Sequence, residues 1–98
     1  MYGTIARLQL KPGTEAELHR LNRELAPAVP GLVFEYAYRM DADPEVVFLV
    51  IGFTDKAAYL ANAANSAQQA RYDQFRVLLV SEPEWHDGEI PFAYPPRE

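Results

Sequence analysis

The side chain best suited to moving protons near neutral pH lies close to the C-terminal end of the chain. It is His86, which directly follows Trp85, and an imidazole titrates in the range where a general base has to work. If this segment is a strand, the two side chains point to opposite faces, so only one of them can enter a given cavity. We take His86 as the candidate catalytic base and Trp85 as a candidate substrate contact. A surface or hydrogen-bonded histidine beside a buried tryptophan is the simpler alternative.

The same segment offers donor atoms for a metal ion. Glu84 and His86 are two residues apart, so they share a face of a strand, and Glu82 is a third potential ligand. The three do not make a compact ligand triad, and an acidic, solvated edge explains them equally well. We therefore expect no metal site. The chain has no cysteine, which excludes disulfides, iron–sulfur clusters and a thiol nucleophile.

Two tyrosines are candidates for contact with an aromatic ligand. Tyr36 and Tyr38 share one face of a strand expected over residues 32–40. Their rings could stack on a ligand while their hydroxyls orient it. Packing in the core or in a dimer interface explains them equally well.

A second candidate group surrounds a break expected between two helices. Asn62, Arg71 and Tyr72 flank the break at Asn65, so polar side chains cluster there. Helix capping and exposure to solvent are the alternative explanation.

The segments that must position these residues follow the order β-α-β-β-α-α-β. Pro12 and Gly13 end a first strand, and Thr14 with Glu17 forms a capping box for a helix. A second such box begins at Ser66. The expected strands cover residues 2–10, 32–40, 46–53 and 82–90, and the expected helices cover residues 14–27, 54–65 and 66–79.

One of these strands has no polar side chain. Because Val46–Phe53 is wholly apolar, both of its faces must be kept from water. Helices of so short a chain cover one face of a sheet, which leaves about four large apolar side chains on the other. Leaving them exposed forgoes about 1.5 to 3 kcal/mol each, against a total stability of about 5 to 15 kcal/mol. A second copy of the chain is the economical cover, so we expect a homodimer.

Length and composition set the remaining limits. The 98 residues predict one domain over residues 1–90 and a proline-rich extended tail over residues 91–98. A net charge of -5 opposes binding to nucleic acid. The sequence has neither a run of 18 apolar residues nor a leader-like start, so we expect no membrane association and a cytoplasmic location.

In the order and spacing of its motifs the chain resembles the dimeric α+β barrel superfamily, and within it the domains similar to antibiotic biosynthesis monooxygenases. The resemblance covers residues 1 to 90. The motifs that carry it are Lys11-Pro12-Gly13, Pro30-Gly31, Tyr38-Arg39, Asp43-Pro44, the stretch from Phe53 to Tyr59, Asn65-Ser66 and the stretch from Pro83 to Glu89.

The resemblance implies a ferredoxin-like α+β fold, with a four-stranded antiparallel sheet that forms a barrel in a homodimer. It also implies a cofactor-independent monooxygenase that acts on a small aromatic or polyketide-like compound. The expected site has His86 as base and Tyr36, Tyr38, Tyr59, Asn62, Arg71, Tyr72 and Trp85 as substrate contacts, with neither metal nor cofactor.

Other activities of the superfamily stay open. Haem-degrading relatives carry an asparagine on the first strand, where this chain offers Thr4 and Ala6, and a tryptophan where it has Tyr59, so haem degradation is not expected. A non-catalytic module that binds a small ligand or serves a stress response is the main alternative. An isomerase or another enolising enzyme is the third.

Overall fold

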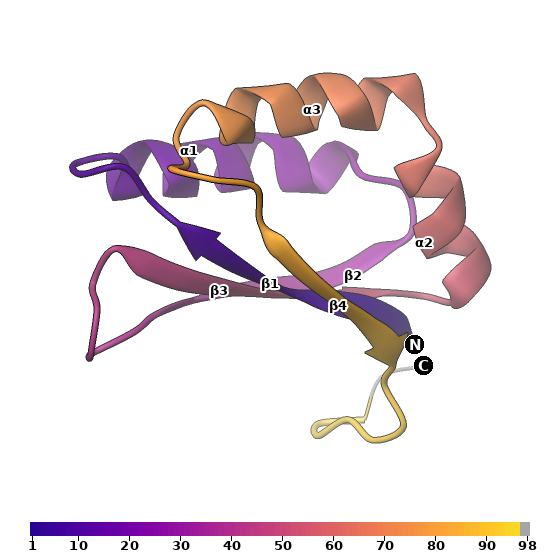
Figure 1. The fold of residues 1–98 in the computed structure, drawn as a ribbon. Helices are drawn as coiled ribbons and strands as arrows, with labels where there is room; N and C mark the ends of the chain where they lie inside the picture. Colours follow the sequence, from indigo (N-terminus) through magenta and orange to yellow (C-terminus); the bar gives the residue numbers. More distant parts are fainter. Residues whose placement is uncertain (97–98) are drawn as a thin grey trace.

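The computed structural model describes residues 1–96 and places the helices in a layer on one face of a sheet (Figure 1). The order β-α-β-β-α-α-β that the sequence predicts is confirmed, with a short 3-10 turn added after the first helix. The elements are β1 (Tyr2–Gln9), α1 (Glu15–Leu25), η1 (Ala26–Ala28), β2 (Leu32–Arg39), β3 (Val46–Phe53), α2 (Lys56–Ala63), α3 (Ser66–Arg76) and β4 (Glu84–Glu89).

The four strands lie in the order β2-β3-β1-β4, and every neighbouring pair is antiparallel. Because β1 and β3 occupy the centre, the wholly apolar strand has a partner on each side. This is the ferredoxin-like α+β arrangement, and the expected fold class is confirmed. The barrel requires a second copy of the chain and stays a prediction.

Two helices begin one residue away from the expected capping residue. The Asp55 carboxylate, rather than Thr54, caps α2 by accepting the amide N–H of Ala58 at 2.7 Å. Asn65, rather than a box starting at Ser66, caps α3. The box predicted at Thr14 is wrong, because the Thr14 hydroxyl donates instead to the backbone carbonyl of Lys11 at 2.7 Å.

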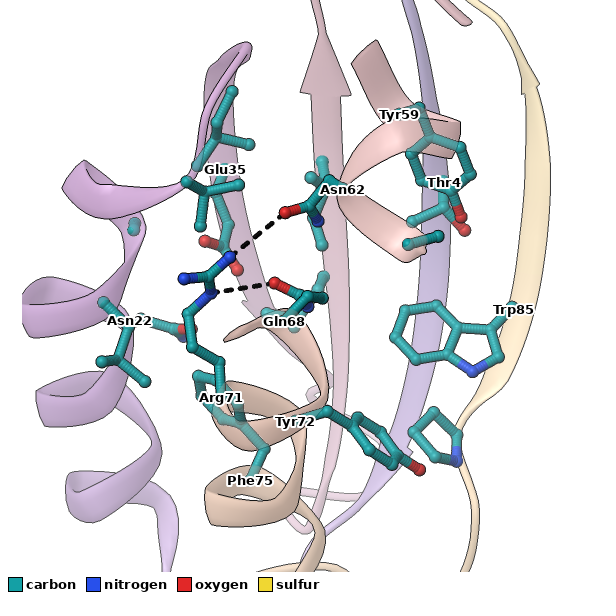
Figure 2. A pocket seen from close by; sticks show the side chains of 18 of the residues that line it. Thr4, Asn22, Glu35, Tyr59, Asn62, Gln68, Arg71, Tyr72, Phe75 and Trp85 are labelled. Atoms are coloured by element: carbon teal, nitrogen blue, oxygen red, sulfur yellow. Dashed lines mark hydrogen bonds between the residues drawn. The ribbon is translucent and has the colours of Figure 1, made fainter. Parts of the chain in front are cut away.

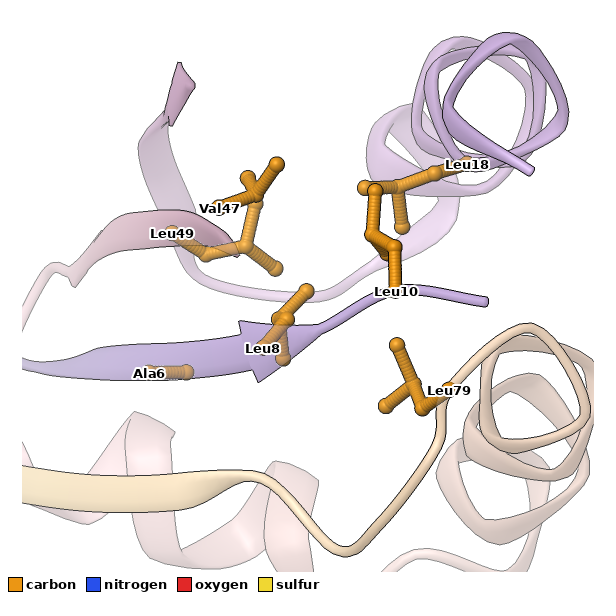
Figure 3. Packing of buried hydrophobic residues seen from close by; sticks show 7 residues of the cluster. All are labelled: Ala6, Leu8, Leu10, Leu18, Val47, Leu49 and Leu79. Atoms are coloured by element: carbon orange, nitrogen blue, oxygen red, sulfur yellow. The ribbon is translucent and has the colours of Figure 1, made fainter. Parts of the chain in front are cut away.

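The core lies between the sheet and α1, at the end of the sheet where α3 finishes (Figure 3). α1 supplies Leu18 and Leu21, which are both buried. α3 ends at Arg76, earlier than expected, and the chain then turns so that Leu79 enters the core beside Leu10. The buried cluster comprises Ala6, Leu8, Leu10, Leu18, Val47, Leu49 and Leu79.

The sheet face that the helices do not cover is called the open face here, and it is rich in apolar and aromatic side chains. Tyr36 is 55% exposed and Tyr38 is 62% exposed, and they pair across the sheet with Val50 and Phe48. Gly52 lies under the ring of Phe34, whose Cε2 would be 2.2 Å from an added Cβ. Within residues 1–96 no helix covers this face of the apolar strand, where Phe48 and Val50 are partly exposed and Val46 is buried by its neighbours.

Residues 91–96, the described part of the expected tail, contain neither helix nor strand. They lie on the side of the sheet away from the helices, with exposed Phe92 and Tyr94. Residues 97 and 98 of the predicted tail lie outside the described part. None of the described helices has the length and apolar character needed to cross a membrane.

Replacing the fully buried Leu18 by alanine tests the position of the core. We expect Leu18→Ala to lower the free energy of unfolding by about 2 to 5 kcal/mol, because it leaves a cavity that the neighbouring elements cannot close. Urea denaturation measures this loss. Leu60→Ala, the same change at an exposed helix position, should stay within about 0.5 kcal/mol of the parent. Equal losses in the two variants would contradict this packing.

Candidate functional site: a cavity between the sheet and the helices

A cavity of about 540 Å³ lies between the sheet and the helices (Figure 2). All four strands contribute to its wall, through side chains such as Glu35 on β2, Ile51 on β3, Thr4 on β1 and Trp85 on β4. The helices supply the opposite wall. Three strand spacings of about 4.8 Å separate β2 from β4, so the cavity spans about 14 Å. This size suits a small organic ligand.

The pairing of β1 with β4 decides between Trp85 and His86. Trp85 lies opposite Ala6, whose side chain is in the core, so the indole points to the helix side and lines the cavity. His86 lies opposite Ile5 on the open face, where its imidazole is 3.8 Å from the Glu84 carboxylate. The structure therefore places His86 outside this cavity, and its role as a base stays a prediction. No three acidic or histidine side chains of residues 1–96 are grouped to hold a metal ion.

The two tyrosines of β2 are also absent from the cavity wall. Tyr36 and Tyr38 share the open face with their partners on β3 and do not line this cavity, so their contact with a substrate stays a prediction. Packing in a dimer interface, the alternative explanation for the two tyrosines, is compatible with this position. The structure does bring the other predicted contacts together around the cavity, namely Tyr59, Asn62, Arg71, Tyr72 and Trp85.

A bulge in β2 turns a carboxylate into the cavity. Leu32 pairs with Phe53 and Phe34 pairs with Gly52, so Val33 is an extra residue in the strand. As a result Leu32 and Glu35, which simple alternation would separate, both line the cavity. Glu35 is partly buried, and this burial raises the pKa of its carboxyl above the ordinary value of 4.5.

At the same end of the cavity, an arginine is held by two side-chain amides. The Arg71 Nε donates to Gln68 Oε1 at 2.9 Å, and its Nη2 donates to Asn62 Oδ1 at 3.2 Å. Both acceptors are neutral, so they fix the guanidinium without cancelling its charge. Within residues 1–96 no ion pair joins Arg71 to a carboxylate. The group is therefore available to an anionic oxygen of a ligand.

At the opposite end of the cavity, a tyrosine hydroxyl is hydrogen-bonded to a carboxylate. The Tyr59 hydroxyl donates to Asp87 Oδ1 at 2.8 Å. Burial, and then the hydrogen bond to Asp87, raise the pKa of Tyr59 to about 12, so its hydroxyl stays protonated at neutral pH. Thr4 is 5% exposed, and its Oγ1 is buried with no hydrogen-bond partner in the described chain. A polar atom of a ligand would satisfy it.

Aromatic rings form the wall between β4 and α3. The Tyr72 and Trp85 rings are 6.4 Å apart between centroids, and both line the cavity. The Tyr72 hydroxyl donates to Glu82, and burial together with this bond raises the pKa of Tyr72 to about 12. Trp85 is 48% exposed, and every residue of the edge strand β4 is exposed. This side of the cavity is the more open to solvent.

Sequence reasoning missed Glu35, Thr4, Gln68 and Asp87. One signal was present for Glu35, since it is the acid in the middle of an otherwise aromatic and apolar strand. The alternation placed it opposite to the tyrosines, but did not tell which face turns inward. For Thr4 and Asp87 the signal is their direct pairing across β1 and β4, which the chain alone does not reveal.

The fold and the cavity together define a ferredoxin-like α+β domain with a ligand-sized pocket on the helix side of its sheet. Solved structures of proteins named as antibiotic biosynthesis monooxygenases share this fold. One, from Chloroflexus aurantiacus, is 19% identical over 95% of each chain, with a TM-score of 0.78. Another, from Bordetella bronchiseptica, is 16% identical over 93% of this chain and 97% of that one, with a TM-score of 0.79.

The chain is also similar to SnoaB, a cofactor-independent oxygenase from Streptomyces nogalater, at 16% identity over 97% of each chain and a TM-score of 0.79. At such low identity the likeness shows the fold. The resemblance found in the sequence is confirmed at that level. No family model matches the sequence, and no curated protein matches it.

Replacing Asp87 tests the geometry of the Tyr59 end. Asp87→Asn should lower the pKa of Tyr59 from about 12 toward, but not to, the ordinary value of 10.0, because burial persists while the neighbouring negative charge is lost. Ultraviolet titration of tyrosinate formation measures this change, in comparison with a Tyr59→Phe variant. Glu89→Gln, two residues further along β4, is the control and should leave the curve unchanged. An unaltered curve in Asp87→Asn would contradict the contact.

Proposed function

We propose that this chain is a cofactor-independent monooxygenase that acts on a small aromatic or polyketide-like compound in the cavity. The observation that carries the proposal is the cavity itself. It combines an apolar and aromatic wall with a charged arginine held by amides, which is the composition expected of a site for a flat, acidic organic molecule. The shared fold with a cofactor-independent oxygenase supports it.

In such a reaction the substrate supplies the electrons. A methylene next to an acidic ring loses a proton, and the resulting anion reacts with dioxygen. One oxygen atom becomes the product carbonyl, and the other leaves as water with the two methylene hydrogens. The protein contributes orientation, a site with little water and stabilisation of the anion. Arg71 is placed for the last role because neutral partners hold its charge.

We also propose that the open face is the interface of a homodimer. Val50, Phe48 and their tyrosine neighbours form a continuous apolar and aromatic surface, and patches of this kind mark interaction sites. The tail with Phe92 and Tyr94 lies on the same side of the sheet, where a partner would cover it. The cavity lies on the other side and stays accessible in such a dimer.

Ligand binding without catalysis is the alternative function, and the single tryptophan separates the two. Trp85 lines the cavity, so its fluorescence reports occupancy, whereas an oxygen electrode reports turnover. A hydroxylated anthrone should change the fluorescence and consume oxygen. Binding without oxygen uptake would favour the non-catalytic module. The absence of both a fluorescence change and oxygen uptake would contradict the proposal.

Arg71→Met tests the stabilisation of the anion. This change keeps the length of the side chain and removes its charge, so oxygen uptake with the anthrone should fall at least tenfold, which corresponds to about 1.4 kcal/mol of transition-state stabilisation. Arg23→Met, at an exposed position of α1, is the matched control. Equal turnover in the two variants would remove Arg71 from the mechanism.

Val50→Asp tests the dimer. Light scattering of the parent should give twice the monomer mass, whereas the variant should be a folded monomer, because its carboxylate would face an apolar partner without a counter-charge. Val80→Asp, in the exposed loop before β4, is the control and should remain dimeric. A monomeric parent, or a Val50→Asp variant that assembles fully, would contradict the interface.

A further inference from the structure

The two carboxylates that line the cavity differ in their surroundings. Asp87, on the edge strand β4, already accepts the hydrogen bond of Tyr59. Glu35, on the opposite edge strand, has neither a hydrogen bond nor an ion pair with any side chain among residues 1–96, and burial alone raises the pKa of its carboxyl. A partly buried carboxylate that has no partner in the protein lowers the stability of the fold. Such groups concentrate at functional sites.

Glu35 and a positively charged side chain lie at the same end of the cavity. Figure 2 shows the Glu35 carboxylate and the Arg71 guanidinium at the end of the cavity away from Trp85. The two do not form an ion pair with each other, since Arg71 is held by Asn62 and Gln68 instead. An acidic hydroxyl of a ligand placed at this end would meet both a proton acceptor and a cation.

We propose that Glu35 accepts the proton of a phenolic or enolic hydroxyl of the substrate, while Arg71 stabilises the oxyanion that remains. This inference rests on the proposed function, because it names the acidic group that the substrate must carry and the end of the cavity at which it lies. It also gives this cavity a proton acceptor, which is the role that the sequence predicts for His86.

The proton transfer conserves atoms and electrons within the complex of protein and substrate. The O–H bond of the substrate breaks, its electron pair stays on the substrate oxygen, and the proton binds an oxygen of the Glu35 carboxylate. No oxidant takes part in this step. Burial supports the transfer, because it raises the affinity of the carboxylate for a proton. Arg71 supports it by favouring negative charge on the substrate.

Few other titratable groups face this part of the cavity. α1 contributes Asn22, which does not titrate, and β3 contributes apolar side chains. The remaining titratable groups of the wall are Tyr59 on α2, Arg71 and Tyr72 on α3, and Asp87 on β4. Both tyrosines have a pKa of about 12 and stay neutral near pH 7. Asp87 lies on the far edge strand.

Nitrophenol is a probe that separates proton transfer from oxygen chemistry, because its ionisation changes its colour and no oxygen is needed. At a pH just below the solution pKa of the probe, the parent should bind it as phenolate without releasing a proton, since Glu35 takes the proton up. In the Glu35→Gln variant, the fraction of bound probe that is phenolate should be at least tenfold lower than in the parent. If the variant does bind phenolate, binding should release one proton to solution for each phenolate bound. Glu45→Gln, an exposed acid before β3, should behave as the parent.

Each outcome of the probe experiment decides one question. A parent that shows no change in Trp85 fluorescence with the probe does not bind it, which contradicts the aromatic site of the proposed function. A Glu35→Gln variant that binds phenolate as the parent does, without proton release, overturns the role of Glu35 and leaves the proposed function standing. Oxygen uptake is measured separately and affects neither conclusion.

The pH dependence of stability distinguishes this role from a structural one. Because the pKa of Glu35 is higher in the folded state than the ordinary value of 4.5, its ionisation weakens the fold as pH rises above that value. Glu35→Gln should therefore be more stable than the parent at pH 7, and the difference should vanish below pH 4.5. A variant that is less stable at both pH values would show a structural glutamate and overturn the proposal.

Discussion

Strand β3 constrains the whole molecule, because both of its faces are apolar. Its central place in the sheet satisfies its backbone, and α1 with the turn after α3 covers the half of one face that carries Val47 and Leu49. No helix among the described residues 1–96 covers the other face, where Phe48 and Val50 are partly exposed. The two sides of the sheet have therefore become different in kind. One encloses a cavity, and the other presents a surface suited to another copy of the chain.

The space between the sheet and the helices has two parts, one filled by side chains and one partly empty. Leucines fill the space beneath α1 and the end of α3, so this end is rigid and dry. Farther along the sheet, α2 and α3 carry small residues and amides, and the layer is left partly empty. A rigid end beside an unfilled one is an arrangement that holds polar side chains in place, because the packed part fixes the strands and helices from which those side chains extend.

The order of the elements could be predicted because each is marked locally, by prolines and glycines at its ends, by leucines at helical spacing or by an apolar run. The capping residues were less certain, since Asp55 and Thr54, or Asn65 and Ser66, are adjacent and chemically equivalent in that role. The inward face of β2 could not be predicted. Alternation separates Tyr36 from Glu35, but the core and an interface both accept aromatic rings, and the bulge at Val33 leaves no mark in composition.

The bulge in β2 has a consequence for how this protein can change over evolution. Neighbouring residues of β2 serve separate purposes, with Glu35 turned to the cavity and Tyr36 turned to the open face. Point substitutions can thus change the open face and the cavity independently. Losing or gaining one residue of this strand outside the bulge would exchange the two faces, placing an aromatic ring in the pocket and an acid on the surface, whereas loss of the extra residue Val33 would leave the pairing unchanged. A change of length in β2 therefore keeps both faces as they are only at the bulge.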